Sequence, residues 1–292
     1  MDMKKQIAGR QGFIAALDQS GGSTPKALRG YGVADSEWSG DDEMYAKIHE
    51  MRSRIITSPS FSNGKVIGAI LFEKTMDSLV EGQPTPQALI DRGIVPFIKI
   101  DKGLEDEKDG VQLMKPMPDL DTLLARAKGL GVFGTKERSV INEANPAGIA
   151  AIVAQQFEVG RQVLAAGLVP MLEPEYSINA EGRAEGEKIL KAEILKNLET
   201  LPEGEQVMLK LSIPVEPNLY ADLIAHPKVL AVVALSGGYS TDEACEKLAQ
   251  NHGMIASFSR GLLQDLRAGQ TDAEFDKTLG DAIDQIYAAS VA

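Results

Sequence analysis

The fold is decided by a short apolar run that carries one charge, Gln206–Ile213, which reads QVMLKLSI. Side chains of a β-strand alternate between its two faces, and positions 207, 209, 211 and 213 are all apolar. That face suits packing against helices, as in a parallel sheet covered by helices. The run therefore predicts a strand whose Lys210 points to the side away from the helices.

Short apolar runs of this kind recur along the chain, each followed by a stretch with helical periodicity, as repeated strand–helix units require. The eight predicted strands are Gly12–Asp18, Val66–Phe72, Val95–Asp101, Val132–Val140, Leu168–Glu175, Gln206–Ile213, Val229–Ser236 and Met254–Arg260. The predicted helices are Asp41–Thr57, Asp119–Lys128, Asn145–Ala166, Ala184–Leu201, Asn218–Ala225, Thr241–Asn251 and Thr271–Ala289. Eight such units in 292 residues predict an α/β protein, a (β/α)8 TIM barrel that occupies residues 1–292 as a single domain.

An open, doubly wound sheet fits the sequence less well than a barrel. The chain has no G-x-G-x-x-G motif, and its nearest P-loop-like fragment, Gly64-Lys65, has Pro59 where the first glycine belongs. The long segment Gln19–Lys65 is expected to be a connection with its own helix, because no linker composition separates it as a second domain.

The composition excludes several classes of protein. With 42 acidic and 30 basic residues the net charge is −12, which disfavours binding to nucleic acid or to a membrane surface. No leader or membrane-spanning stretch is evident, so a cytoplasmic location is expected. One cysteine, Cys245, and three widely spaced histidines predict neither a disulfide nor a soft-metal site.

The parity of the strands predicts which charged side chains point into the barrel. In the third strand Ile98 and Ile100 point outward, so Lys99 and Asp101 point inward. The strand Val132–Val140 is less regular, because Glu137 would point outward, while Lys136 and Arg138 share a face with Val132. The predicted inward set near the strand ends is Asp18, Lys99, Asp101, Lys136, Arg138, Glu173, Glu175 and Lys210.

Eight charges at the carboxyl end of a barrel favour a catalytic centre, although a structural ion-pair network is the alternative for any one of them. A lysine flanked by other cations and buried is expected to have a lowered pKa and to act as a nucleophile. Its neutral amine would attack a carbonyl carbon and form an iminium. Carboxylates such as Glu173 and Glu175 would supply the acid and the base.

Three glycine-containing segments are candidates for two anion sites. Ser236-Gly237-Gly238 ends the seventh strand and Ser259-Arg260-Gly261 ends the eighth, where barrels often hold phosphate. After the first strand, Gly21-Gly22-Ser23 followed by Lys26 is a candidate for a second phosphate.

Six segments in this order resemble class I, Schiff-base-forming fructose-1,6-bisphosphate aldolases, and the bacterial form is the closer match. They are AALDQS (15–20), IKIDKG (98–103), FGTKER (133–138), LEPE (172–175), MLKL (208–211) and LSGG (235–238). The similarity runs over essentially the whole chain. It implies a barrel enzyme that cleaves fructose 1,6-bisphosphate reversibly in glycolysis and gluconeogenesis, without metal or other cofactor.

The resemblance also implies roles for individual residues. Lys210 would form the Schiff base, Glu173 would be the main acid and base with Glu175 beside it, Lys136 would be the charge partner, and Asp18 would act at the hydroxyl that directs cleavage. The residues implied in substrate binding are Lys99, Arg138, Ser236, Gly237, Gly238 and Arg260, with Ser23 as the candidate of the second anion site. Animal members place the matching arginine two residues after Arg260. Homo-oligomers are common in the family.

Three other functions fit parts of the pattern. Another Schiff-base aldolase of this barrel type would act on a monophosphate such as a deoxyribose or sedoheptulose phosphate, which two anion sites disfavour. A metal-dependent lyase or isomerase would use the four carboxylates as ligands, and the interleaved cations disfavour that. A non-catalytic sugar-phosphate-binding barrel would bind without turnover.

Overall fold

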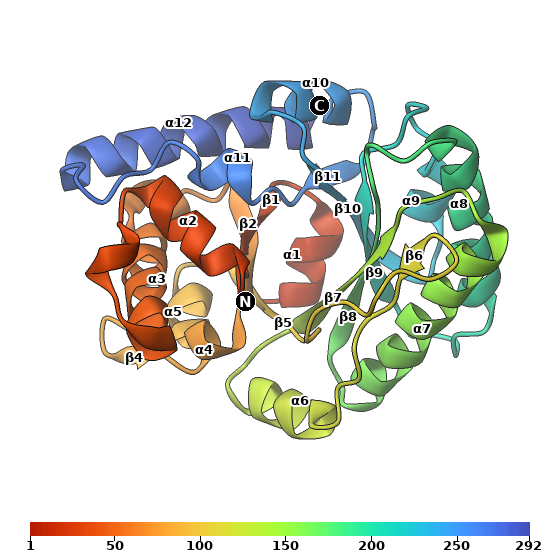
Figure 1. Cartoon of the computed structure of the whole chain (residues 1–292), viewed down its shortest axis with the longest axis horizontal. Helices are drawn as coiled ribbons and strands as arrows, with labels where there is room; N and C mark the ends of the chain where they lie inside the picture. Colours follow the sequence, from red (N-terminus) through yellow and green to blue (C-terminus); the bar gives the residue numbers. More distant parts are fainter.

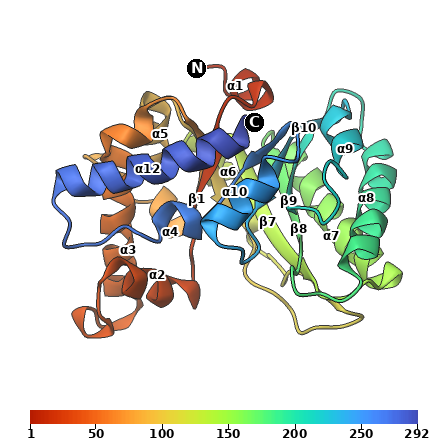
Figure 2. The same ribbon diagram turned by 90° about the horizontal axis from the view of Figure 1, so that it is seen from above.

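The computed structural model describes all residues, 1–292, and has the predicted barrel at its centre (Figures 1 and 2). Eight parallel strands follow one another in the order of the sequence. They are β1 (Phe13–Leu17), β2 (Val66–Leu71), β5 (Val95–Lys99), β7 (Gly134–Ile141), β8 (Val169–Tyr176), β9 (Val207–Ser212), β10 (Val229–Leu235) and β11 (Met254–Ala256). The predicted (β/α)8 barrel is confirmed.

Helices surround the barrel. They are α1 (Met3–Gly9), α2 (Ser23–Tyr31), α3 (Gly40–Thr57), α4 (Glu73–Met76), α5 (Thr85–Asp91), α6 (Leu120–Gly129), α7 (Pro146–Ala165), α8 (Arg183–Glu199), α9 (Ala221–Ala225), α10 (Thr241–Leu248), α11 (Arg260–Leu263) and α12 (Asp272–Ser290). No helix combines the length and the apolar character needed to cross a membrane.

Two separate apolar layers explain the alternation of the strands. A cluster of 63 buried residues lies between the strands and the surrounding helices, and a cluster of 12 fills the barrel. Phe97, Met171 and Met208 belong to the inner cluster, each two residues before a predicted inward charge. Helix α1 places Ile7 in the same cluster and so lies across the amino end of the barrel (Figure 1). The interior is therefore apolar at the amino end and charged toward the carboxyl end.

Three sequence expectations need correction. The last strand ends at Ala256, and Arg260 is the first residue of the short helix α11. Strand β7 begins at Gly134, so Val132 lies outside it in the outer cluster and does not share a face with Lys136. The connection 19–65 contains two α-helices rather than one.

Several short elements were not predicted, because no periodic pattern in the sequence marks them. Besides α1, α4 and α5, they are the hairpin of β3 (Leu79–Val80) and β4 (Gln83–Pro84), and β6 (Val111–Gln112), which pairs antiparallel with β7. Such short segments lack the length over which hydrophobic periodicity can be recognised.

Side chains close the barrel where β1 and β11, the two ends of the sheet, meet. The Ser290 hydroxyl at the end of α12 donates to the Gly12 carbonyl at 2.8 Å and accepts from the Ala256 amide at 2.9 Å. At the carboxyl end, the Gln19 amide donates to the Ser259 hydroxyl. Helix α12 also packs on α10 and α11, as Figures 1 and 2 show. The C-terminal helix thus contributes to closing the barrel.

Candidate active site

A buried lysine on β7 stands at the centre of the charged end of the barrel. Lys136 Nζ lies 2.7 Å from Asp18 Oδ2, 2.9 Å from Glu173 Oε2 and 4.0 Å from Asp101 Oδ2. Its side chain is only 3 % exposed. Strands β1, β5, β7 and β8 therefore converge on one ammonium group.

Lys210 reaches the same cluster from β9. Its Nζ lies 3.1 Å from Glu173 Oε1, so the two lysines bind the two oxygens of one carboxylate. Strand register places Glu173 opposite Arg138 of β7, two residues beyond Lys136. Lys210 has one carboxylate partner, whereas Lys136 has three.

The electrostatics of this cluster keep its central groups ionised. Burial alone would disfavour the charge on Lys136, but Asp18, Glu173 and Asp101 surround it and raise its pKa. The pKa of Asp18 is lowered, because Lys136 and Lys210 outweigh its burial. Glu173 likewise has a lowered pKa despite full burial, through the same two lysines. The two lysines therefore favour the ionised form of Glu173.

The remaining predicted strand charges form two further pairs. Lys99 Nζ lies 2.7 Å from Asp101 Oδ1, and the backbone amide of Arg138 donates to Asp101 Oδ2 at 3.2 Å. Two residues beyond Lys136 and Glu173 on their strands, Arg138 Nε donates to Glu175 Oε2 at 2.5 Å. This pair is more open, since the Arg138 side chain is 38 % exposed. Paired carboxylates and cations, rather than a group of three acidic ligands suited to a metal ion, characterise the site.

The structure brings the predicted anion-binding residues of strands seven and eight together. Gly237 and Gly238, with φ of 61° and 118°, form a turn after β10 that residues with a Cβ rarely adopt. A Cβ on Gly238 would lie 3.6 Å from Arg260 Nη2, so the guanidinium of Arg260 is beside this turn. Arg260 has no carboxylate within ion-pair distance. A cation without a carboxylate partner thus lies beside the glycine turn that follows Ser236.

The second candidate anion site, at Gly21-Gly22-Ser23, has its serine hydroxyl engaged within its own turn. The Ser23 hydroxyl donates to the Ser20 carbonyl at 2.8 Å and accepts from the Ser20 amide at 3.0 Å. It begins α2 and closes the turn that precedes it. Its only proton is therefore engaged in this turn. The side chains of Lys99 and Arg138 line the barrel mouth on strands β5 and β7 instead.

Sequence reasoning missed a buried arginine that supports the site. Arg52 of α3 is fully buried, and it donates to Thr75 Oγ1 at 2.7 Å and to the Gln19 carbonyl at 2.5 Å. Gln19 in turn donates to Ser259, next to Arg260. Burial lowers the pKa of Arg52 to about 10, which leaves it charged at neutral pH. Its place among Ile48, Met51 and Ile55 on the buried face of the helix is the signal that could have identified it.

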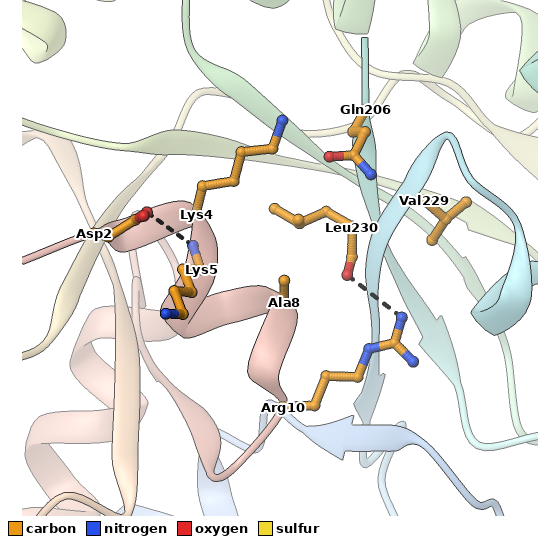
Figure 3. Close-up of a pocket in the computed structure, with 8 residues that line it drawn as sticks. All are labelled: Asp2, Lys4, Lys5, Ala8, Arg10, Gln206, Val229 and Leu230. Atoms are coloured by element: carbon orange, nitrogen blue, oxygen red, sulfur yellow. Dashed lines mark hydrogen bonds between the residues drawn. The ribbon is translucent and has the colours of Figure 1, made fainter. Parts of the chain in front are cut away.

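A cavity lies at the other end of the barrel, away from the charged cluster. It measures about 460 Å³ and is lined by α1 and the starts of β9 and β10, with Lys4, Arg10, Gln206 and Leu230 around it (Figure 3). Arg10 Nη2 donates to the carbonyl oxygens of Ile224 and Leu230 at 3.0 and 3.5 Å. None of the predicted site residues lines this cavity.

A comparison with known protein families shows to which family the chain belongs. A sequence model described as "Fructose-bisphosphate aldolase class-I" matches residues 2–218, more than two thirds of the 292 residues. The chain belongs to the class I fructose-bisphosphate aldolase family. The matched region contains Asp18, Lys136, Glu173 and Lys210, the residues of the central cluster.

Solved structures show that the fold of this class I aldolase family member extends over the rest of the chain. A fructose-bisphosphate aldolase from Plasmodium falciparum is 19 % identical, with a TM-score of 0.77 over 99 % of this chain and 95 % of that one. A Corynebacterium glutamicum protein is 15 % identical, with a TM-score of 0.53 over 98 % of this chain and 92 % of that one. The barrel, including the segment beyond residue 218, is thus that of the aldolase.

Proposed function

We propose that this protein is a fructose-bisphosphate aldolase of glycolysis and gluconeogenesis. It cleaves fructose 1,6-bisphosphate reversibly into dihydroxyacetone phosphate and glyceraldehyde 3-phosphate through a Schiff base on Lys210. The observation that carries the proposal is the Glu173 carboxylate, whose two oxygens lie 3.1 Å from Lys210 and 2.9 Å from Lys136. One carboxylate can thereby serve one lysine as acid and base while the other lysine stabilises its charge.

The choice of Lys210 over Lys136 as nucleophile follows from their partners. A nucleophilic amine must be neutral, and three carboxylates hold Lys136 in its charged form. Lys210 has one carboxylate within ion-pair distance, Glu173, which takes its proton in the proposed reaction. The neutral Lys210 then attacks the C2 carbonyl carbon of the substrate and forms a carbinolamine. Glu173 returns the proton to the carbinolamine hydroxyl, which leaves as water and gives the iminium.

Carbon–carbon cleavage needs a base at the C4 hydroxyl. The ionised form of Asp18 is favoured, because Lys136 and Lys210 lower its pKa despite burial. Its Oδ2 lies 2.7 Å from Lys136 Nζ, in the same cluster as Glu173 and Lys210. It takes the hydroxyl proton, the C4 carbonyl forms, and the C3–C4 bond breaks. The electron pair of that bond passes to the iminium and produces an enamine. The enamine takes up one proton at C3, which balances the proton that Asp18 removed from the C4 hydroxyl, and addition of water then releases dihydroxyacetone phosphate and free Lys210.

A bisphosphate is supported by cations at two sides of the barrel mouth. Arg260 and the Ser236–Gly238 turn lie after β11 and β10, and Lys99 and Arg138 lie on β5 and β7. Arg260 has no carboxylate partner, whereas Lys99 and Arg138 are paired with Asp101 and Glu175, so a second phosphate would share these two cations with carboxylates. The same six motifs favour the bacterial form of the family. A cytoplasmic location is the expectation from the composition, and homo-oligomers are common in the family.

Borohydride trapping tests this function. The protein is incubated with dihydroxyacetone phosphate and EDTA, reduced with sodium borohydride, and analysed by intact mass and peptide mapping. The expected result is one adduct, on Lys210, which the Lys210→Met variant lacks together with nearly all turnover. Absence of an adduct, with activity abolished by EDTA, would overturn the Schiff base in favour of a metal-dependent reaction.

A further inference from the structure

A buried ion pair outside the barrel connects the ends of two strands of the site. Arg183 and Glu187, in the first turns of α8, form a salt bridge of 2.7 Å between Nε and Oε1. Their side chains are 5 % and 0 % exposed. Burying both charges costs several kcal/mol of desolvation, which their attraction offsets only with further hydrogen bonds. The pair is therefore a poor source of stability by itself, and its other partners indicate what it does.

One set of partners follows the strand of the proposed nucleophile. Arg183 Nη2 donates to the Ile213 carbonyl, and the Val215 amide donates to Glu187 Oε2 at 2.8 Å. Ile213 is three residues beyond Lys210. Helix α8 also packs closely against the end of β8, since a Cβ on Gly186 would lie 1.8 Å from the Tyr176 hydroxyl oxygen. The ion pair thus fixes the end of β9 to the start of α8.

The other partner belongs to the glycine turn of the proposed phosphate site. Arg183 Nη1 donates to the Tyr239 hydroxyl at 3.0 Å, and Tyr239 directly follows Ser236-Gly237-Gly238. The Tyr239 amide donates to the Ser236 carbonyl at 3.0 Å and closes the turn. Ile178 packs against the turn from another side, 2.6 Å from where a Cβ of Gly237 would lie. Glycines lose the most conformational freedom when ordered, so such a turn needs external contacts to hold its amides in place.

We propose that Tyr239 is a positioning residue for the phosphate group nearest the Schiff base. Through Arg183 its hydroxyl holds the Ser236–Gly238 turn at a fixed place relative to the end of β9 and hence to Lys210. This inference rests on the proposed function, because it assumes that a phosphate-bearing ketone binds Lys210 and the turn together. It assigns Tyr239 and the Arg183–Glu187 pair a role in affinity for phosphate-bearing ligands, with no contact to the reacting atoms.

The variant Tyr239→Phe removes only the hydroxyl and keeps the ring, which lies 5.1 Å from Lys247 Nζ. Its matched control is Tyr220→Phe. Tyr220 is fully buried, with a pKa raised by burial and by the nearby Glu187, but its hydroxyl has no hydrogen-bond partner. Both substitutions delete a hydroxyl near the Arg183–Glu187 pair. Only Tyr239→Phe removes a hydrogen bond between this pair and the Ser236–Gly238 turn.

The readout is the ketone concentration that gives half-maximal borohydride trapping at Lys210, measured with dihydroxyacetone phosphate and with dihydroxyacetone, which lacks the phosphate. For Tyr239→Phe we expect a rise of about tenfold for the phosphate ester, the effect of one hydrogen bond from a charged donor, and less than twofold for dihydroxyacetone. Inhibition by inorganic phosphate should weaken by the same factor. Tyr220→Phe should change none of these values.

The outcomes separate this inference from the proposed function. Equal effects on both ketones, or equal effects of the two substitutions, would show a merely structural role and overturn the positioning role of Tyr239. No effect of Tyr239→Phe on the phosphate ester would overturn it as well. If the wild-type protein itself is not trapped at Lys210, the proposed function fails first.

Discussion

Lys136 and Glu137 are adjacent on β7 and lie on opposite sides of the barrel wall, with opposite electrostatic surroundings. Lys136 points inward to three carboxylates, which raise its pKa. Glu137 points outward, is fully buried, and has only the Thr135 hydroxyl, at 3.2 Å, as a side-chain partner. Burial therefore raises the pKa of Glu137 well above its usual range. Burial thus favours the neutral form of a carboxyl group that lies directly behind the charged site.

The raised pKa of Glu137 predicts that the stability of the protein falls as pH rises. Its pKa is higher in the folded than in the unfolded chain, where a glutamate ionises near pH ~4.3. Above that pH the unfolded chain releases a proton that the folded chain retains, so the free energy of unfolding decreases by up to about 1.4 kcal/mol per pH unit until the folded pKa is reached. We expect Glu137→Gln to remove this loss and to be more stable than wild type at pH 8 but not at pH 4.

Urea unfolding at both pH values measures this difference. The control is Glu158→Gln, the same change at an exposed position of α7, which should alter stability by less than about 0.5 kcal/mol at either pH. A wild-type stability that stays level between pH 5 and pH 8, matched by Glu137→Gln, would contradict the neutral state of Glu137.

The central cluster could be predicted from the sequence, because the alternation of side chains along a strand is a local property. Period-two alternation assigns Lys99, Lys136 and Lys210 to one face, and the parallel register of a barrel brings these faces together. Glu137 was identified only as an irregularity of this pattern. The rise in its pKa depends on burial by the helix packed over it, which alternation within one strand does not specify.

Arg260 is the cation expected to bind the phosphate on the Schiff-base side. It lies beside the Gly237–Gly238 turn and has no carboxylate partner, so its charge is free for an anion. We expect Arg260→Met to raise the KM for fructose 1,6-bisphosphate roughly tenfold to a hundredfold, the loss of a charge-assisted contact, with little change in kcat. Steady-state kinetics of this variant and of Arg161→Met, a change on the exposed side of α7, measure the effect. An unchanged KM for Arg260→Met would assign the phosphate to other residues.

Contacts between distant segments could not be predicted in this way. Arg260 is near Gly238 because a turn and the first residue of a short helix meet in space, and Arg183 reaches Tyr239 across 56 positions of the chain. Closure through Ser290, 278 positions from Gly12, is equally non-local. Periodicity predicts on which face of a helix or strand a residue lies, but it does not predict which loop contacts that face.

Lys136 should be more important for stability than Lys210. Lys136→Met would leave Asp18, Glu173 and Asp101 close together without their shared cation. Removing one partner of buried charges costs about 3–5 kcal/mol, and lower pH should restore part of it as the carboxylates become protonated. We expect Lys210→Met, which deprives Glu173 of one of two lysines, to cost less. Thermal unfolding of both variants at pH 5 and pH 7.5 tests the order, and an equal loss would contradict it.

Asp18 offers a way to separate Schiff-base formation from bond cleavage. In the proposed reaction it takes the C4 hydroxyl proton, a step that follows the iminium, and its ion pair with Lys136 is 2.7 Å long. Asp18→Asn keeps the size of the side chain and removes the base, so turnover of fructose 1,6-bisphosphate should fall by about 10²- to 10⁴-fold. Borohydride trapping of dihydroxyacetone phosphate on Lys210 should persist, because that step uses Glu173. Loss of trapping together with turnover would mean that Asp18 acts before the iminium forms, through its effect on Lys136 and Glu173, and not on the C4 hydroxyl.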